Sequence, residues 1–220
     1  MKFAMLLAFS LISFFAPFDD PAPAPIVEKE FEYKTWKHKS VNDGKEIKLR
    51  EFVAGKKLVL VVYFAPWCRN SGMEAPFIQK MYEKYKGDGF DVIAVGLYGS
   101  TEEMRDFQKA HQTTYTTVYE TTSYNARTTT MHYENRQKVG DTRKWGTPWN
   151  IFLEPAKLLP EGDILTNKAF IANGEFYEAE AEKFIRQKLG LPEMPVGSAA
   201  EKREIEACAN EPAKPQFKKP

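Results

Sequence analysis

The feature that most constrains the fold of this chain is an apolar run that ends at a proline and a single cysteine. Residues 59–64 are apolar and rich in β-branched side chains, and the run is too short for a convincing helix, so it predicts a buried strand. Ala65 and Pro66 form a turn, and helical spacing begins after Cys68. A cysteine at the first turn of a helix faces unpaired backbone N–H groups and the positive end of the helix dipole, which favours a nucleophilic thiolate.

The residues after Cys68 predict a parallel β-α-β arrangement. Apolar side chains recur on one face of the expected helix, at Phe77, Ile78, Met81, Tyr82 and Tyr85. Residues 91–98 form a second apolar run, and Ser100 with Glu103 has the pattern of a capping box. The helix that follows should turn three side chains inward, namely Met104, Phe107 and Ala110. Strand, helix, strand and helix in this order indicate parallel strands.

Composition limits the class of protein. The chain has 220 residues, of which 43% are hydrophobic and 28% charged, as expected for one main globular domain. Its 31 basic and 30 acidic residues give a net charge of +1. Neither a nucleic-acid partner nor strong attraction to anionic lipid is expected from this balance.

The first 25 residues have the pattern of an export signal followed by a stiff spacer. Met1 and Lys2 precede the apolar stretch 3–18, and a Pro/Ala-rich stretch completes the segment. The predicted location is therefore extracytoplasmic, periplasmic or secreted, and a membrane is a partner only if residues 3–18 are retained as an anchor. Residues 26–191 are predicted to form the domain, and residues 192–220 a flexible Pro-rich tail.

Shorter signals predict the elements at either end of the domain. Residues 31–36 alternate apolar and polar side chains, and with the turn signal at 42–45 they indicate short strands or a hairpin before the core strand. Residues 169–177 resemble a hairpin with Asn173-Gly174 at its turn. A closing helix should bury Ala181, Phe184, Ile185 and Leu189.

The stretch 113–144 is dominated by threonine and tyrosine. It predicts a strand near residues 116–119 and then a long polar loop, which is either a lid that faces the substrate or a plain surface insertion. His132 would lie in this loop without a second ligand beside it, so no metal site is expected. His38 and His111 are expected at the surface.

A second informative stretch surrounds Pro148, which directly precedes the apolar run 149–153. A proline in that position must start a strand, lie at a sheet edge or follow a cis peptide bond.

Residues 64–71, followed by Glu74 and Pro76, resemble the extracytoplasmic thioredoxin-like proteins of the TlpA type within the redoxin and AhpC/TSA group. These proteins share a Trp-Cys-x-x-Cys motif, and Gly146-Thr147-Pro148 is similar to their cis-proline segment. The resemblance covers about residues 27–191. It implies an α/β, thioredoxin-like fold with a central mixed sheet flanked by helices, and thiol-disulfide oxidoreductase activity on protein or small-molecule thiols and disulfides, with no cofactor.

Two departures from the family pattern matter. Ser71 occupies the position of the second cysteine, and the threonine-rich stretch is longer than the usual connection. A second cysteine normally resolves the mixed disulfide from within, which Ser71 cannot do, although it could hydrogen-bond the sulfur of Cys68. Release then needs a glutathione-like thiol, a partner protein or Cys208. A tail of about 17 residues has a root-mean-square reach of roughly 20 Å, so Cys208 could pair with Cys68 or resolve its adducts, or it could remain unpaired or bridge to another molecule.

The resemblance also assigns roles to five further residues. Glu74 would lie near Cys68 and tune its thiol, or else it is an ordinary solvated helix residue. Thr147 and Pro148 would present backbone to a substrate, with Trp67 and Trp149 as apolar walls.

Three functions are consistent with these residues. The first is thiol-disulfide exchange through one nucleophilic cysteine, and the second is a non-enzymatic module that holds or senses thiol-containing partners. The third, a thiol peroxidase, lacks the usual Pro-x-x-x-Thr/Ser-x-x-Cys setting, since Val61 and Ala65 occupy those positions.

Overall fold

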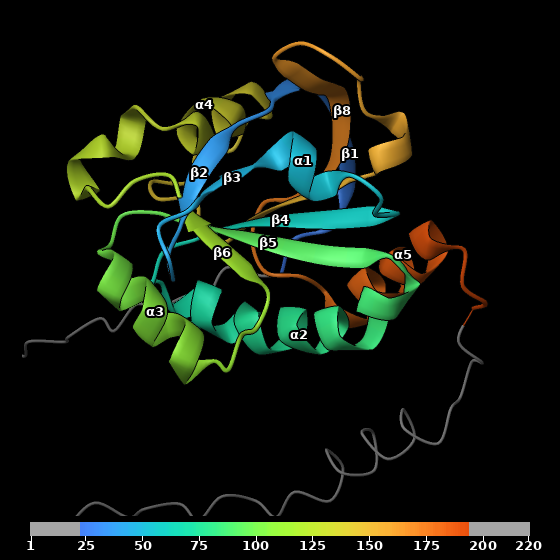
Figure 1. Ribbon diagram of the computed structural model, residues 1–220, viewed down its shortest axis with the longest axis horizontal. Helices are drawn as coiled ribbons and strands as arrows, with labels where there is room; N and C mark the ends of the chain where they lie inside the picture. The colour runs from blue at the N-terminus through green and yellow to red at the C-terminus, as the bar shows by residue number, and fades with distance from the viewer. Residues whose placement is uncertain (1–22, 194–220) are drawn as a thin grey trace, which may run out of the picture.

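The strand predicted next to Cys68 forms the centre of a sheet. In the computed structural model, which describes residues 23–193, strand β4 (Leu58–Phe64) pairs in parallel with β5 (Phe90–Gly96) and antiparallel with β7 (Trp149–Leu153) (Figure 1). All the side chains of β4 are buried. A continuous apolar run, rather than an alternating one, is what a strand covered on both faces requires.

The sheet has eight strands in the order β1-β8-β7-β4-β5-β6-β2-β3. Its outer strands are β8 (Ile164–Ala172) and β1 (Val27–Lys34) on one side, and β6 (Thr116–Tyr119), β2 (Lys37–Ser40) and β3 (Glu46–Lys48) on the other. The β4–β5 and β5–β6 pairs are parallel and the remaining pairs are antiparallel. The predicted α/β fold with a central mixed sheet is therefore confirmed.

Helices cover both faces of the sheet (Figure 1). One face packs against α2 (Arg69–Tyr85), α3 (Thr101–Ala110) and α5 (Glu178–Leu189). The other packs against α1 (Leu49–Val53) and α4 (Met131–Lys138). Short 3-10 turns complete the chain at η1 (Lys86–Asp88), η2 (Tyr124–Thr128) and η3 (Pro155–Lys157).

The helices on the first face follow their sequence patterns closely. Four of the five predicted side chains of α2 are buried and the fifth, Tyr82, is half-buried. Ser100 and Glu103 form the predicted capping box of α3. Ala110, predicted to face inward, is exposed because α3 ends at that residue. The inward stripe of α5 is also confirmed, with Phe184 half-buried.

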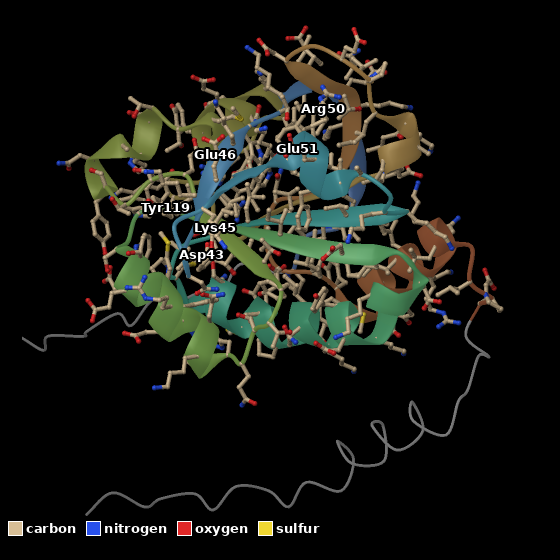
Figure 2. The ribbon with its side chains drawn as sticks, viewed as in Figure 1. Asp43, Lys45, Glu46, Arg50, Glu51 and Tyr119 are labelled. Carbon is tan, nitrogen blue, oxygen red and sulfur yellow. The ribbon has the colours of Figure 1, made fainter. Side chains whose placement is uncertain are left out.

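The predicted hairpin before the core strand is formed by β2 and β3. Asp43 and Lys45 lie close together at its turn (Figure 2), where the Lys45 backbone N–H donates to the Asp43 carboxylate at 3.2 Å. Arg50 of α1 donates to the carbonyl of Gly162 at 2.8 Å, which connects this part of the chain to the loop before β8. His38 was predicted to be solvated but is half-buried, because its ring stacks on Trp36 with centroids 4.5 Å apart.

The long polar loop predicted after β6 is wrong. The segment contains η2 and α4, and Thr130 caps α4 by accepting a hydrogen bond from the Tyr133 backbone N–H at 3.0 Å. His132 lies on this helix, fully buried, and stacks on Tyr63 of β4 with centroids 5.0 Å apart. The inward residues of α4 are polar, so no apolar periodicity reveals the helix in the sequence.

The hairpin predicted at Asn173-Gly174 is also wrong. Strand β8 is already paired with β7 on one side and with β1 on the other, so no place remains for a returning strand. The chain instead passes from Gly174 directly towards α5.

Among residues 23–193, no helix is both long enough and apolar enough to cross a bilayer. The expected signal or anchor at residues 3–18 and the tail from residue 194 lie outside the described residues.

Candidate active site

Cys68 lies at the point where β4 passes into α2. It is the N-cap residue of α2: its carbonyl accepts from the Gly72 N–H at 3.1 Å, and its own N–H donates to the Ala65 carbonyl at 3.0 Å. The side chain is half-buried and forms no disulfide within the described residues. Its thiol donates to the carbonyl of Thr147 at 3.5 Å. The strand-turn-helix arrangement predicted from the sequence therefore positions the sulfur at a helix N-terminus.

The segment opposite Cys68 is placed there by the register of the sheet. Trp149 pairs with Tyr63, so residues 146–148 reach the end of β4 from which the Cys68 turn begins. The Thr147–Pro148 peptide bond is cis. Thr147 and Pro148 are both buried, so a substrate could meet this backbone only where it borders the sulfur.

A buried cluster of charges holds the same segment. Asp141 accepts from Arg136 at 2.9 Å and from Arg143 at 2.7 Å. Arg143 also donates to the carbonyls of Gly146 and Pro148, at 3.3 and 3.2 Å. Burial opposes ionisation of Asp141, but the hydrogen bonds from the two guanidinium groups outweigh it and lower the pKa of Asp141 to about 2.

Gly146 is required beside this cluster. Its φ is +65°, and a Cβ there would lie 1.7 Å from the Cζ atom of Arg136. His132 approaches the same residue from α4, with its Nε2 atom 3.3 Å from the Gly146 carbonyl and its Nδ1 atom 3.3 Å from the Tyr98 hydroxyl. Burial, followed by the charge of Arg136, holds the pKa of His132 well below its usual value. A neutral imidazole thus packs behind the segment.

Glu74 and Ser71 lie on the inner side of α2, not in solvent. They are 4% and 3% exposed, and with Pro148 they border a cavity of about 10 Å³, close to the smallest that can hold one water. Asn150 donates to Glu74 at 2.9 Å, yet burial raises the pKa of Glu74 well above its usual value. The solvated interpretation of Glu74 is therefore wrong.

The hydroxyl of Ser71 makes no hydrogen bond within residues 23–193. The expected contact between Ser71 and the sulfur of Cys68 is thus not formed, and the thiol contacts the Thr147 carbonyl instead.

The outer side of Cys68 is open. A hollow of about 370 Å³ lies beside it, bordered among others by Trp67, Met73 and His111. Trp67 is 41% exposed, as a substrate wall requires, and its indole N–H donates to the Tyr98 carbonyl at 2.7 Å. His111, expected to be a simple surface residue, packs on the ring of Phe107 with centroids 4.5 Å apart and borders this hollow.

The second tryptophan expected as a wall lies elsewhere. Trp149 is fully buried, and its indole N–H donates to Asn173 at 2.7 Å, so it supports the site from the core. The rings that accompany Trp67 at the surface are Tyr124 and Trp145, which sequence reasoning missed. Their only signal was their place in or directly after the long threonine-rich stretch.

Two expectations concern other parts of the site. Cys208 lies outside the described residues. In the part of the chain that the structure describes, no three His, Cys, Asp or Glu side chains gather in a way that could hold a metal ion.

Comparison with known proteins identifies the family of this chain. Residues 25–149 match the model of the AhpC/TSA family. Thiol-disulfide oxidoreductase ResA from Bacillus thuringiensis subsp. konkukian and the protein of the same name from Bacillus cereus are each 29% identical over 69 residues. The match covers 31% of this chain and 39% of either relative.

Solved structures share the architecture. A thiol:disulfide interchange protein of the thioredoxin family from Chlorobium tepidum TLS superimposes with a TM-score of 0.51 at 16% identity, over 74% of this chain and 98% of its own. A DsbF homologue from Corynebacterium diphtheriae gives a TM-score of 0.52 at 16% identity, over 79% and 97%. At these identities the likeness establishes a thioredoxin-like fold.

Proposed function

The chain belongs to the AhpC/TSA family, and from that premise we propose that it is an extracytoplasmic thiol-disulfide oxidoreductase that acts through one cysteine, Cys68. The observation that carries the proposal is the position of the Cys68 thiol. It is half-buried at the N-terminus of α2, in contact with the Thr147 carbonyl, and open to solvent on the side of Trp67. A substrate disulfide can therefore reach the sulfur from the side of Trp67.

The proposed reaction proceeds in two exchanges. The Cys68 thiolate attacks one sulfur of the substrate disulfide; that S–S bond breaks, a mixed disulfide forms, and the second substrate sulfur leaves as a thiolate and takes up a proton. An incoming thiolate then attacks the mixed disulfide and regenerates Cys68. Protein or small-molecule thiols and disulfides are the partners of both steps.

Ser71 determines where the second thiol comes from. In the Trp-Cys-x-x-Cys pattern that the motif resembles, a second cysteine stands at this place in the sequence, and the buried Ser71 hydroxyl cannot resolve a mixed disulfide. The resolving thiol is therefore external or belongs to Cys208. Glu74, buried behind Ser71, is the candidate proton-holding group of the site.

Single substitutions in the full chain test the proposal. Cys68→Ala should abolish reduction of a model disulfide, and persistent activity in that variant would remove the proposal. Cys208→Ala should slow turnover if the tail supplies the resolving thiol, and added glutathione should then restore it. Ser71→Cys should make resolution internal, so that the mixed disulfide no longer accumulates.

The alternative is a module that traps or senses thiol proteins without turnover. Ser71 favours it as well, because a mixed disulfide without an internal resolving thiol persists. Non-reducing gels distinguish the two: a trapping module accumulates covalent partners in wild type, whereas an enzyme accumulates them only when external thiol is withheld. Peroxide consumption that depends on Cys68 would instead support the third function, thiol peroxidase.

The location is part of the proposal. We assign residues 3–18 to an export signal or membrane anchor and residues 26–191 to the domain that follows it. Fractionation of the producing cells, with the intact mass of the purified chain, tests both. An unprocessed chain in the cytoplasm would contradict export.

A further inference from the structure

Three aromatic rings next to the Cys68 turn form a surface that we name the aromatic wall: the exposed Trp67 and Tyr124 and the half-buried Trp145. The ring centroids of Trp67 and Trp145 are 5.1 Å apart, those of Trp67 and Tyr124 6.2 Å, and those of Tyr124 and Trp145 6.4 Å. Trp67 is 41% exposed and Tyr124 49%. Large aromatic side chains that gather in solvent next to a reactive group indicate a binding surface.

The wall is held in place rather than loosely assembled. The indole N–H of Trp67 donates to the Tyr98 carbonyl, and the ring of Tyr98 packs on Trp145 with centroids 5.3 Å apart. Tyr124 begins η2, whose N-cap Ser123 accepts a hydrogen bond from the Asn125 backbone N–H at 3.2 Å. Three separate segments of the chain thus converge on one surface, and little side-chain ordering remains for a partner to impose.

Positive charge accompanies the aromatic wall. Arg127 and Lys144 lie over the ring of Trp145, with their charged groups 5.6 and 5.8 Å from its centroid. Arg127 also donates to the Lys144 carbonyl at 3.1 Å, which keeps the two together. The segment 121–148 contains five basic and two acidic residues, although the whole chain has a net charge of only +1. Arg136 and Asp141 are buried and pair with each other, which leaves four basic residues, Arg127, Lys138, Arg143 and Lys144, against one acidic residue, Glu134.

We propose that the aromatic wall, with Arg127 and Lys144, binds an extended segment of a substrate polypeptide in which a large apolar residue and acidic residues lie next to the disulfide cysteine. This inference rests on the proposed function and names its substrate class. Trp67 belongs both to the wall and to the hollow at Cys68, so a molecule that covers the wall also reaches the sulfur. Three adjoining rings offer more contact area than a small disulfide can fill.

The aromatic wall takes no part in the exchange of bonds. The Cys68 thiolate attacks the substrate sulfur, the thiolate on the other side of that disulfide leaves, and the wall contributes binding alone. Substitutions at Tyr124, Arg127 or Lys144, which do not border the hollow at Cys68, should therefore change the reaction of peptide disulfides and leave that of a small neutral disulfide unchanged.

The test compares single-turnover rates in the full chain carrying Cys208→Ala. Two peptides each hold one cysteine as a mixed disulfide with thionitrobenzoate, whose release is coloured; one peptide has phenylalanine and two glutamates beside the cysteine, the other phenylalanine and two lysines. Hydroxyethyl disulfide, followed by mass, is the small neutral substrate.

The acidic peptide should react faster than the basic one. Arg127→Glu combined with Lys144→Glu should slow the acidic peptide by about threefold to tenfold, as expected for two surface ion pairs, of which that of Arg127 is half-buried.

A matched control reverses two exposed lysines away from the site, with Lys29→Glu and Lys183→Glu. It should leave all three rates unchanged, and Tyr124→Ala should slow both peptides but not hydroxyethyl disulfide. Equal rates for the two peptides in wild type, or an acidic-peptide rate that the reversal at Arg127 and Lys144 leaves unchanged, would overturn the inference while the proposed function stands.

A second readout does not depend on Cys68 reactivity. The acidic peptide with serine in place of its cysteine should change the tryptophan fluorescence of wild type, and the Arg127→Glu, Lys144→Glu variant should need about threefold to tenfold more peptide for the same change. Absence of reaction with every disulfide would remove the proposed function, whereas absence of this fluorescence change would remove the peptide-binding surface. The surface would instead be assigned to lipid if wild type sedimented with anionic vesicles, the Arg127→Glu, Lys144→Glu variant did not, and the two proteins reacted with the peptides at the same rates.

Discussion

Glu120 links the end of β6 to the first residues of α4 through hydrogen bonds. It directly follows β6, and its carboxylate accepts from the Met131 N–H and, at 3.3 Å, from the His132 N–H. Burial raises the pKa of Glu120 to about 7 against the lowering effect of these hydrogen bonds. Glu120→Gln keeps an acceptor for the backbone N–H groups and removes the titration.

The size of the effect follows from linkage. An ordinary glutamate has a pKa near 4.5, so between that value and about 7 the folded chain binds a proton that the unfolded chain has released. Stability is therefore highest below pH 4.5 with respect to this group and falls as the pH rises to about 7. The shift corresponds to roughly 3 kcal/mol, at 1.36 kcal/mol for each pKa unit.

Urea unfolding at pH 5 and pH 8, followed by far-UV circular dichroism, measures this directly. Wild type should lose more stability between the two pH values than Glu120→Gln does, by up to about 3 kcal/mol. Glu180→Gln, at an exposed position in the first turn of α5, should keep the wild-type dependence. The same loss in wild type and Glu120→Gln would refute the proposed burial of this carboxylate.

Three further substitutions probe the walls of the site. Glu74→Gln should stabilise the protein relative to wild type, and more so at pH 8 than at pH 5, because burial raises the pKa of Glu74 and makes its ionised form costly. The amide keeps the hydrogen bond from Asn150, and urea titrations of both proteins at the two pH values give the difference. Gly146→Ala should cost on the order of 3 kcal/mol or more because its Cβ overlaps Arg136, whereas Gly162→Ala, with open space at a similar φ, should cost about 1 kcal/mol; urea midpoints compare the two. Arg136→Met should cost about 3–5 kcal/mol in the same assay, since it leaves a buried carboxylate without one partner.

Local sequence patterns predicted the strand, turn and helix that carry Cys68, because residues close together in the sequence form them. The continuous apolar run of β4 needs no distant information, and neither does the helix that begins after Cys68. The capping box at Ser100 is equally local. These patterns predict the strand and the helix on either side of Cys68, because the same few residues determine both the backbone conformation and which side chains are buried.

The remainder depends on tertiary packing. The inward face of α4 consists of His132, Asn135 and Arg136, which are polar side chains that become buried only when the segment folds onto the sheet, so hydropathy could not reveal it. Asn173-Gly174 has the local signal of a hairpin, but β1 occupies the edge of β8 that a returning strand would need. The aromatic wall, likewise, exists only after η2 folds against the Cys68 turn.

Intact mass after reaction tests the proposed use of Cys68. The full chain is mixed with hydroxyethyl disulfide, without added thiol, and its mass is measured for wild type, Cys68→Ala, Cys208→Ala and Ser71→Cys. We expect one stable adduct on Cys208→Ala, no adduct at position 68 in Cys68→Ala, and loss of the adduct in Ser71→Cys as an internal disulfide forms. A chain that gains no adduct at Cys68, or a Cys208→Ala variant that sheds its adduct without added thiol, would contradict exchange through a single unresolved cysteine.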